Sequence, residues 1–105
     1  NEAGIVKASV LKDGRFFKMW YSFRNFDGYR ENIQNSYRIG YAESINGIDW
    51  TRKDHKAGID VSSAGWDSLM IEYPHVIDYK DKRLMFYNGN GFGKSGFGYA
   101  ELLKD

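Results

Sequence analysis

KMWY at residues 18–21 recurs as LMFY at residues 84–87. Behind each copy follows a second matched strand, IGYAE at residues 39–43 and FGYAE at residues 97–101. The first pair is offset by 66 residues and the second by 58. The difference falls in the segment between the two matched strands, where insertions are easily tolerated. The chain is therefore an internal repeat of two units.

Strand signals dominate the whole sequence. Turn sequences at Asp13-Gly14 and Asn46-Gly47 separate segments rich in β-branched and aromatic residues. No segment keeps a helical period over three turns, and residues 53–68 are polar and predict a long loop. We therefore expect an all-β chain with strands at residues 5–11, 15–22, 37–43, 48–52, 69–77, 83–88 and 97–103.

The repeated unit predicts the architecture. Each unit reads as an apolar strand, a turn, an aromatic strand, a loop and a Gly-Tyr-Ala strand, and the first unit adds a fourth strand at Trp50. Four-stranded antiparallel meanders of about 40–50 residues are typical of β-propeller blades. We predict one blade over residues 1–52, an inter-blade loop over 53–68, and a second blade over 69–105 whose outer strand is short or missing.

Residues 84–87 are apolar on both faces of their strand, which predicts that both faces are covered. Two blades leave two outer faces bare, and propellers close with about four blades or more. We therefore expect a homo-oligomer. Three copies would give six blades, which we favour, and two copies would give four.

Composition excludes several classes of protein. The 105 residues include 15 Lys and Arg and 14 Asp and Glu, a net charge of +1. A charge this close to zero does not indicate binding to nucleic acid or to an anionic membrane. Cysteine is absent, and no apolar run reaches the ~18–20 residues of a membrane span. With no signal peptide visible, we expect a soluble chain and favour the cytoplasm, the compartment staying open. The first residue, Asn1, is not Met, which leaves open processing or excision from something longer.

One end of the predicted blades collects the long loops. In an antiparallel meander, successive connections alternate between ends, so residues 24–36, 53–68 and 89–96 fall together. Long loops on a rigid scaffold are where function is expected. Glu72 lies at the start of an inner strand on that end, close to the central axis.

These residues resemble a known superfamily. EYPHVI at 72–77, followed by a turn and LMFYN at 84–88, is similar to the general-acid motif of the five-bladed propeller glycosidases of families 43 and 32, which include arabinanases, xylosidases, invertases and levansucrases. SINGIDW at 44–50 and YRIGYA at 37–42 resemble that superfamily's recurring hairpin and third strand.

The resemblance implies a carbohydrate-directed module with Glu72 as the general acid. The superfamily site uses two further carboxylates: one that attacks the sugar or activates water across it, which glycoside cleavage requires besides the acid, and one that orients and tunes. The first unit has Lys7-Ala8-Ser9-Val10 where an acidic residue and Pro would be expected, so Asp60 and Asp67 are the loop candidates. The substrate-binding candidates are Trp66, His75, Asn88, Asn90 and Arg24. Several of these have structural alternatives: Trp66 in packing, His75 as a hydrogen-bonded residue, and the asparagines as turn formers.

Other interpretations stay open or are rejected. The chain is alternatively a non-catalytic sugar-binding or structural propeller piece, or an excised fragment without activity of its own. The G-x-G-x-x-G match at residues 91–96 has no following helix to receive a pyrophosphate. His55 and His75 lack an obvious third ligand, so we expect no metal site and no cofactor.

Overall fold

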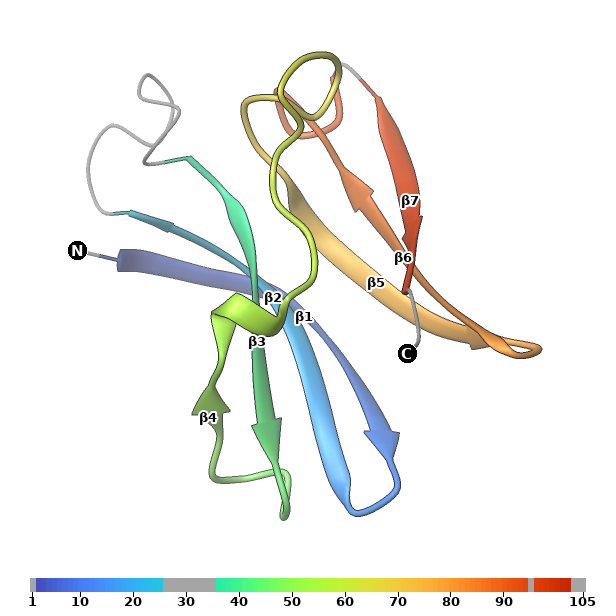
Figure 1. Cartoon of the computed structure of the whole chain (residues 1–105). Helices are drawn as coiled ribbons and strands as arrows, with labels where there is room; N and C mark the ends of the chain where they lie inside the picture. The colour runs from blue at the N-terminus through green and yellow to red at the C-terminus, as the bar shows by residue number, and fades with distance from the viewer. Residues whose placement is uncertain (1, 26–35, 95, 103–105) are drawn as a thin grey trace.

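The computed structural model describes residues 2–25, 36–94 and 96–102. Within them the chain forms β-strands and one short 3-10 helix, η2 (Figure 1). In chain order these are β1 (Glu2–Asp13), β2 (Phe16–Asn25), β3 (Arg38–Ser44), β4 (Thr51–Arg52), η2 (Asp54–Lys56), β5 (Glu72–Tyr79), β6 (Lys82–Asn88) and β7 (Phe97–Glu101).

The strands form two antiparallel sheets. The first sheet has the order β1-β2-β3-β4 and the second sheet the order β5-β6-β7. The described residues contain no α-helix, which confirms the all-β prediction. The described helix is too short and too polar to cross a membrane. The division of the chain into two blades at residues 52 and 69 stays a prediction.

Several element boundaries differ from the sequence-based expectation. The strand expected at 48–52 is only Thr51–Arg52, because Ser44 and Asn46 hold residues 45–49 in a turn. There the Asn46 side-chain oxygen accepts hydrogen bonds from the backbone N–H groups of Ile48 and Asp49, and Gly47 takes a φ of +77°. The loop at 53–68 contains η2, and β5 starts at Glu72 rather than at residue 69. The loop expected at 24–36 lies mostly outside the described residues.

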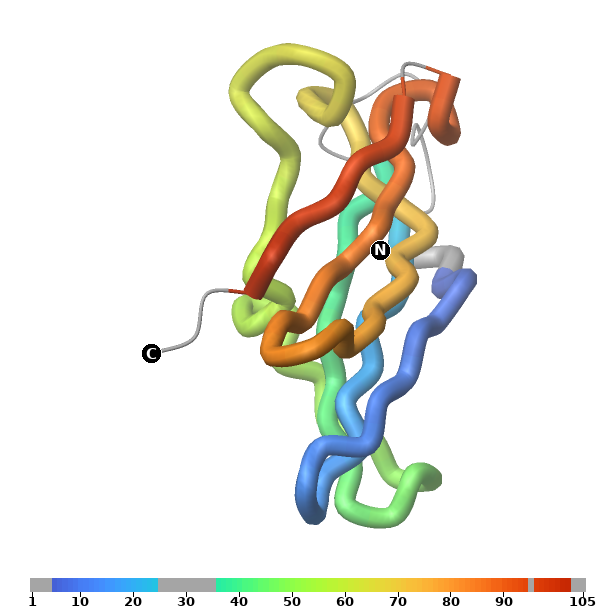
Figure 2. The backbone as a smooth tube through the Cα atoms, turned by 90° about the vertical axis from the view of Figure 1, so that its right-hand side faces the viewer, coloured from blue at the N-terminus to red at the C-terminus, as the bar shows by residue number. Residues whose placement is uncertain are grey.

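The two sheets pack face to face. Figure 2 looks onto the second sheet with the first sheet behind it. The buried core between them takes residues from both sheets and from the segment that joins them: Trp20, Ile39, Tyr41, Ala57, Ile71, Val76, Met85 and Tyr87. Burying side chains of this size contributes about 1.5–3 kcal/mol each, so this one interface holds the fold together.

Polar contacts fix how the sheets sit on each other. The backbone N–H of Val76 donates to Ser9 Oγ at 2.9 Å, and the backbone N–H of Tyr73 donates to Ser22 Oγ at 2.6 Å. Both bonds join the open edge of β5 to side chains of the first sheet, so the edge of β5 does not face solvent there. Arg83 adds an ion pair to Asp13, with 3.1 Å between Nη1 and Oδ2.

The internal repeat holds at the level of strand register. In the first sheet Val6 pairs with Ser22 and Ser9 pairs with Trp20, with one extra residue between. In the second sheet Glu72 pairs with Asn88 and His75 pairs with Phe86, again with one extra residue. Each of these positions differs from its counterpart by 66, so both sheets carry the same β-bulge at the same place.

Two matched glycines allow close packing across the repeat. Gly40 lies opposite Tyr21 on the neighbouring strand, and Gly98 lies opposite Tyr87. A Cβ on Gly40 would meet the Tyr21 ring at 2.7 Å, and a Cβ on Gly98 would meet the Trp66 ring at 2.6 Å. Only glycine fits at either position without a shift of the aromatic ring.

Candidate functional site

Glu72 is the first residue of β5, and its side chain is completely buried, at 0% exposure. Neither carboxyl oxygen has a hydrogen-bond partner among the described residues. Burial raises the pKa of this carboxyl from 4.5 to about 7, because the charged form loses its hydration and gains no compensating contact. At neutral pH Glu72 therefore exists as a mixture of the acid and the carboxylate.

The β-bulge after Glu72 sets its position. Tyr73 adopts a φ of +58°, in the left-handed region that a bulky residue rarely enters. Pro74, which has no N–H to offer a ladder, occupies the bulge, where strands tolerate proline. The bond from Tyr73 N–H to the buried Ser22 Oγ anchors the bulge to the first sheet. Glu72 is thereby held where the two sheets meet.

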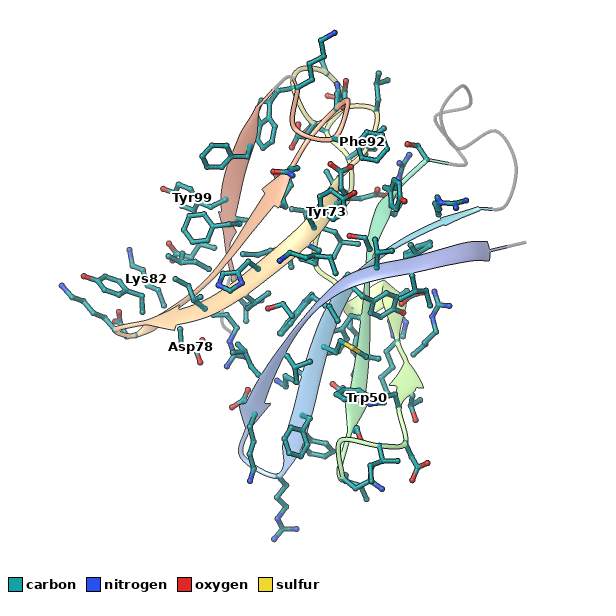
Figure 3. The ribbon with its side chains drawn as sticks, turned by 180° about the vertical axis from the view of Figure 1, so that it is seen from behind. Trp50, Tyr73, Asp78, Lys82, Phe92 and Tyr99 are labelled. Atoms are coloured by element: carbon teal, nitrogen blue, oxygen red, sulfur yellow. The ribbon has the colours of Figure 1, made fainter. Side chains whose placement is uncertain are left out.

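Three aromatic rings gather around Tyr73, the residue that follows Glu72 in β5. The ring centroids of Tyr37 and Phe92 are 5.5 Å apart in an edge-on arrangement, and Tyr73 lies 6.3 Å from Tyr37 and 6.5 Å from Phe92. Figure 3 shows Tyr73 and Phe92 close together at the loop end of the sheets. Burial raises the pKa of the Tyr73 hydroxyl, with smaller effects from Tyr37 and Glu72.

Sequence reasoning does not single out this aromatic cluster of Tyr37, Tyr73 and Phe92. The sequence predicts Tyr37 only as a strand residue, and it places Phe92 in a glycine-rich turn. The available signal is Tyr73 itself, which follows Glu72 directly in the chain. The other two rings come from segments far apart in the sequence, so their convergence depends on the packing of the sheets.

The two candidate partner carboxylates are engaged elsewhere. Asp67 is buried and accepts a hydrogen bond from the Tyr87 hydroxyl at 2.9 Å. Asp60 is 77% exposed and forms an ion pair with Arg38, with 3.3 Å between Oδ1 and Nε. Burial accounts for the raised pKa of Glu72, and no second carboxylate among the described residues contributes to it. Asp60 and Asp67 therefore each have a partner other than Glu72.

The side chains of Trp66 and Asn90 stabilise the segment that leads into β5. Trp66 stacks on Tyr87, with 5.4 Å between ring centroids and 24° between planes. The Asn90 side chain accepts hydrogen bonds from the backbone N–H groups of Leu69 and Met70 and donates one to the carbonyl of Gly65. These contacts bring the segment before β5 and the β6–β7 loop side by side at one end, as Figure 1 shows.

The remaining candidates do not converge on one point. His75 pairs with Phe86 and its side chain is exposed. Asn88 is the strand neighbour of Glu72, and its side chain lies against Gly93, where a Cβ would come within 3.3 Å of Asn88 Cγ. Arg24 is half-buried near the end of β2. Of the sequence-based candidates, the structure places Asn88 next to Glu72 along the sheet.

Two grooves of the described structure lie apart from Glu72. Within residues 2–25, 36–94 and 96–102, no three His, Asp or Glu side chains gather as a metal site would require. A groove of about 300 Å³ opens between the sheets beside Trp20, Val76 and Met85, and Glu72 does not line it. Another of about 360 Å³ lies over Phe86 and Tyr99, again without Glu72.

Comparison with known proteins shows relatives and a shared fold. No family model matches the chain. Two uncharacterized proteins of Mycobacterium tuberculosis, MT1551 of strain CDC 1551 and Rv1502 of strain H37Rv, are each 41% identical, over 102 and 93 residues. These matches cover 97% and 89% of the chain but 31% and 28% of the relatives. The chain thus spans about a third of the length of the curated relatives it matches.

Solved structures of similar shape include enzymes that act on glycosides. A structure described as a glycoside hydrolase superposes with a TM-score of 0.69 at 22% identity, covering 96% of the chain and 28% of that protein. An exo-1,5-alpha-L-arabinanase from a bovine ruminal metagenomic library gives a TM-score of 0.63 at 11% identity, covering 96% of the chain and 36% of the enzyme. The likeness shows the fold alone: an all-β chain of two antiparallel sheets that resembles part of these propeller proteins.

Proposed function

We propose that the chain is part of a carbohydrate-directed propeller of the five-bladed glycosidase superfamily, in which Glu72 acts as the general acid. The two sheets are then two of its blades. The observation that carries this proposal is the buried Glu72 carboxyl, which lacks a hydrogen-bond partner in the described residues and has a pKa of about 7. The similarity of the fold to glycoside hydrolases supports it.

A carboxyl group with this pKa suits proton donation at neutral pH. In the proposed step the protonated Glu72 gives its proton to the glycosidic oxygen while the bond from the sugar carbon to that oxygen breaks. The leaving alcohol takes the proton and Glu72 remains as a carboxylate. A second carboxylate must attack the sugar carbon or activate water, from about 5–5.5 Å in retaining or about 6.5–9.5 Å in inverting enzymes. Because Asp60 and Asp67 are engaged with Arg38 and Tyr87, we assign that carboxylate to a further blade.

The aromatic cluster gives the proposed site a surface for sugar. Sugar rings present C–H groups on their faces, and these groups pack well on aromatic rings. Phe92 is 40% exposed, so it is the accessible member of the cluster. Tyr73 connects this surface to Glu72, its neighbour in the chain.

A second function is favoured by one specific observation. Glu72 has no exposed surface, so a glycosidic oxygen reaches it only if the covering residues move. A propeller that keeps the fold and has lost catalysis, binding sugar or acting only in assembly, needs no such movement. Under this alternative Glu72 is a buried group without a reaction to perform.

Hydrolysis of chromogenic aryl glycosides separates the two functions. A panel of 4-nitrophenyl arabinofuranosides, xylosides and fructosides is offered to the complete propeller that contains this chain, as the wild type and as Glu72→Gln. We expect the variant to lose a factor of about 10²–10⁴ in kcat on the cleaved substrate. On the matching 2,4-dinitrophenyl glycoside the loss should be much smaller, because that leaving group needs no proton.

Glu43→Gln is the matched control, because Glu43 bonds to Tyr41 and Lys53 at the far end of β3 and touches no proposed site residue. Equal turnover of wild type and Glu72→Gln removes Glu72 from the mechanism. Binding of oligosaccharides by calorimetry without any turnover of the panel favours the sugar-binding alternative.

A further inference from the structure

The Asn90 side chain uses both of its polar atoms on the segment that precedes β5. Its Oδ1 accepts hydrogen bonds from the backbone N–H groups of Leu69, at 2.7 Å, and Met70, at 3.2 Å. Its Nδ2 donates to the Gly65 carbonyl at 3.1 Å and to Ser68 Oγ at 3.3 Å. One side chain of the β6–β7 loop is therefore bonded to four residues that lie 20 to 25 positions earlier in the chain.

These bonds matter because residues 65–70, which we call the lead-in segment, belong to neither sheet. The backbone N–H of Asn90 also donates to the Trp66 carbonyl at 2.7 Å, and a Cβ on Gly89 would meet the Trp66 ring at 2.5 Å. Figure 1 shows the lead-in segment and the β6–β7 loop at the same end of the sheets. The backbone bond does not involve the Asn90 side chain, so a variant at this position removes the side-chain bonds and keeps one anchor.

The position of Glu72 depends on the lead-in segment because the ladder of β5 is interrupted near its start. Glu72 pairs with Asn88, and the β-bulge leaves no further regular pair until His75. A strand end that is followed by such a gap opens more easily than the middle of a ladder. The place of Glu72 is therefore set largely by what holds the chain before and after it.

The residues just before Glu72 form a buried run that is held from two sides. Met70 is 8% exposed, and Ile71 and Glu72 are both 0% exposed. The backbone N–H of Ile71 donates to the Tyr37 carbonyl at 3.2 Å, which attaches the run to the first sheet. Asn90 bonds to Met70 and attaches the run to the β6–β7 loop. The two attachments together keep water away from the Glu72 carboxyl.

We propose that Asn90 is a positioning residue for Glu72, because its side chain holds the lead-in segment in the place that keeps the carboxyl buried. Asn90 acts through the backbone of Leu69 and Met70 and does not contact the substrate. The same loop carries Phe92, the accessible ring of the aromatic cluster, so Asn90 also fixes that surface relative to the acid. The effect on burial follows from these contacts alone, whereas the effect on catalysis rests on the proposed function.

A carbon-13 NMR titration of the Glu72 carboxyl tests the effect on burial. It is carried out on the complete protein that contains this chain, as the wild type and as Asn90→Ala. Burial raises the pKa of Glu72 to about 7, and loss of the Asn90 side chain should let water reach the carboxyl. We expect the midpoint to fall by about one pH unit or more towards its ordinary value. The neighbouring Tyr73 adds no charge of its own, because burial raises its pKa above 10.

Asn46→Ala is the matched control. Asn46 Oδ1 likewise accepts two backbone N–H groups, those of Ile48 at 2.8 Å and Asp49 at 2.9 Å. The variant therefore loses bonds of the same kind, in the turn between β3 and β4. Because this turn makes no printed bond to the lead-in segment, the midpoint of Glu72 should stay near pH 7.

Two further variants separate positioning from a general loss of structure. Asn90→Asp keeps an oxygen that can accept the N–H groups of Leu69 and Met70, and its negative charge opposes ionisation of Glu72. Its midpoint should therefore stay at the wild-type value or rise. Ser68→Ala serves if Asn90→Ala does not fold: it removes only the bond from Asn90 Nδ2 and the bond to the carbonyl three residues earlier. Its midpoint should fall by a smaller amount.

The pH dependence of turnover tests the effect on catalysis. If the midpoint falls from 7 to about 6, the protonated fraction of Glu72 at pH 7 falls from about one half to about one tenth. Asn90→Ala should then lower kcat about fivefold on the cleaved 4-nitrophenyl glycoside at pH 7, and the loss should disappear near pH 5. The matching 2,4-dinitrophenyl glycoside should show little loss at either pH. A merely structural defect would lower both rates at both pH values.

A folded Asn90→Ala with the wild-type midpoint overturns the proposal, as does an equal fall in Asn46→Ala. If Asn90→Ala does not fold, an unchanged midpoint in Ser68→Ala overturns it. A midpoint that falls in Asn90→Ala, in a protein that cleaves no glycoside of the panel, supports the positioning role and contradicts the proposed function. Turnover that requires Glu72 and is insensitive to Asn90→Ala supports the proposed function and overturns the positioning role.

Discussion

The first sheet and the second sheet share a strand register, a β-bulge and a pair of close-packing glycines, yet they differ at the bulge. Val6 in the first sheet stands where Glu72 stands in the second. Val6 is 39% exposed, whereas Glu72 is fully buried. The residue that follows has a left-handed conformation in both sheets, with a φ of +53° at Lys7 and +58° at Tyr73.

The bulge is common to both sheets and so belongs to the scaffold, whereas the buried carboxyl is present only in the second sheet and so belongs to the candidate site. Backbone strain often marks functional sites. Here the same strain occurs at Lys7 without an acid beside it, so the strain belongs to the bulge of the repeated sheet. The repeated sheet forms the same bulge with Val6 at the matching position, so the bulge itself does not require the carboxyl of Glu72. A buried carboxyl without a hydrogen-bond partner in the described residues opposes folding, which is why its presence favours a functional explanation.

The largest expected difference between the sheets concerns the matched residues Trp20 and Phe86. Trp20 is 6% exposed in the core, so Trp20→Ala should lower the free energy of unfolding by about 3–5 kcal/mol. Phe86 is only partly buried within one copy, so Phe86→Ala should cost about 1 kcal/mol. Urea unfolding at a concentration where the chain is monomeric measures both. Equal losses would show that the two faces are not covered differently.

A second prediction uses the pH dependence of folding. Glu72 has a pKa of about 7 in the folded chain and 4.5 as its ordinary value. Between these pH values the folded state holds a proton that the unfolded state has lost, so the free energy of unfolding falls as the pH rises. The loss amounts to at most about 3 kcal/mol between pH 4 and pH 8.

Glu72→Gln should lack this loss, so its stability relative to the wild type should increase with pH over that interval, as measured by urea unfolding. Glu43 provides the contrast, because bonds from Lys53 and Tyr41 lower its pKa. Glu43→Gln should become less stable relative to the wild type as the pH rises. A stability difference between Glu72→Gln and the wild type that is constant with pH would contradict the buried acid.

The smallest expected effect concerns the strain that the two bulges share. Lys7→Gly should raise the free energy of unfolding by about 0.5–1 kcal/mol, because glycine enters the left-handed region without the cost that other residues meet. The Lys7 side chain is exposed, so little packing is lost. Lys7→Ala is the matched control and should give no gain, since alanine keeps the strain. Thermal unfolding of the wild type, Lys7→Gly and Lys7→Ala measures the difference in stability. A more stable Lys7→Ala would show that the gain comes from loss of the lysine side chain and not from relief of backbone strain.

Much of the fold can be predicted from the sequence because the same pattern of strands and turns occurs in it twice. The Gly-Tyr-Ala strands, the aromatic strands and the Asp13-Gly14 turn follow from local patterns, and the structure contains them. The position of Glu72 near the start of its strand follows from the same pattern. The sequence predicts the start of β5 three residues too early, because residues 69–71 are apolar like a strand but belong to the segment held by Asn90.

The contacts of the site cannot be predicted in the same way. Tyr37 and Phe92 reach Tyr73 only through the packing of two sheets, which no local pattern encodes. The bonds of Asp60 to Arg38 and of Asp67 to Tyr87 likewise join residues 20 or more apart in sequence. Burial of Glu72 is a property of the packed sheets as well, and its raised pKa follows from that burial.

The most direct test of the central claim is a carbon-13 NMR titration of the Glu72 side-chain carboxyl between pH 3 and pH 9, with Glu72→Gln to assign the signal. The claim is that the second sheet holds a buried acid that the first sheet lacks. It predicts a midpoint near pH 7, well above that of Glu43, whose pKa is lowered by its bonds to Lys53 and Tyr41. A midpoint near 4.5 would mean that the carboxyl is hydrated, and would contradict both the buried acid and its proposed role.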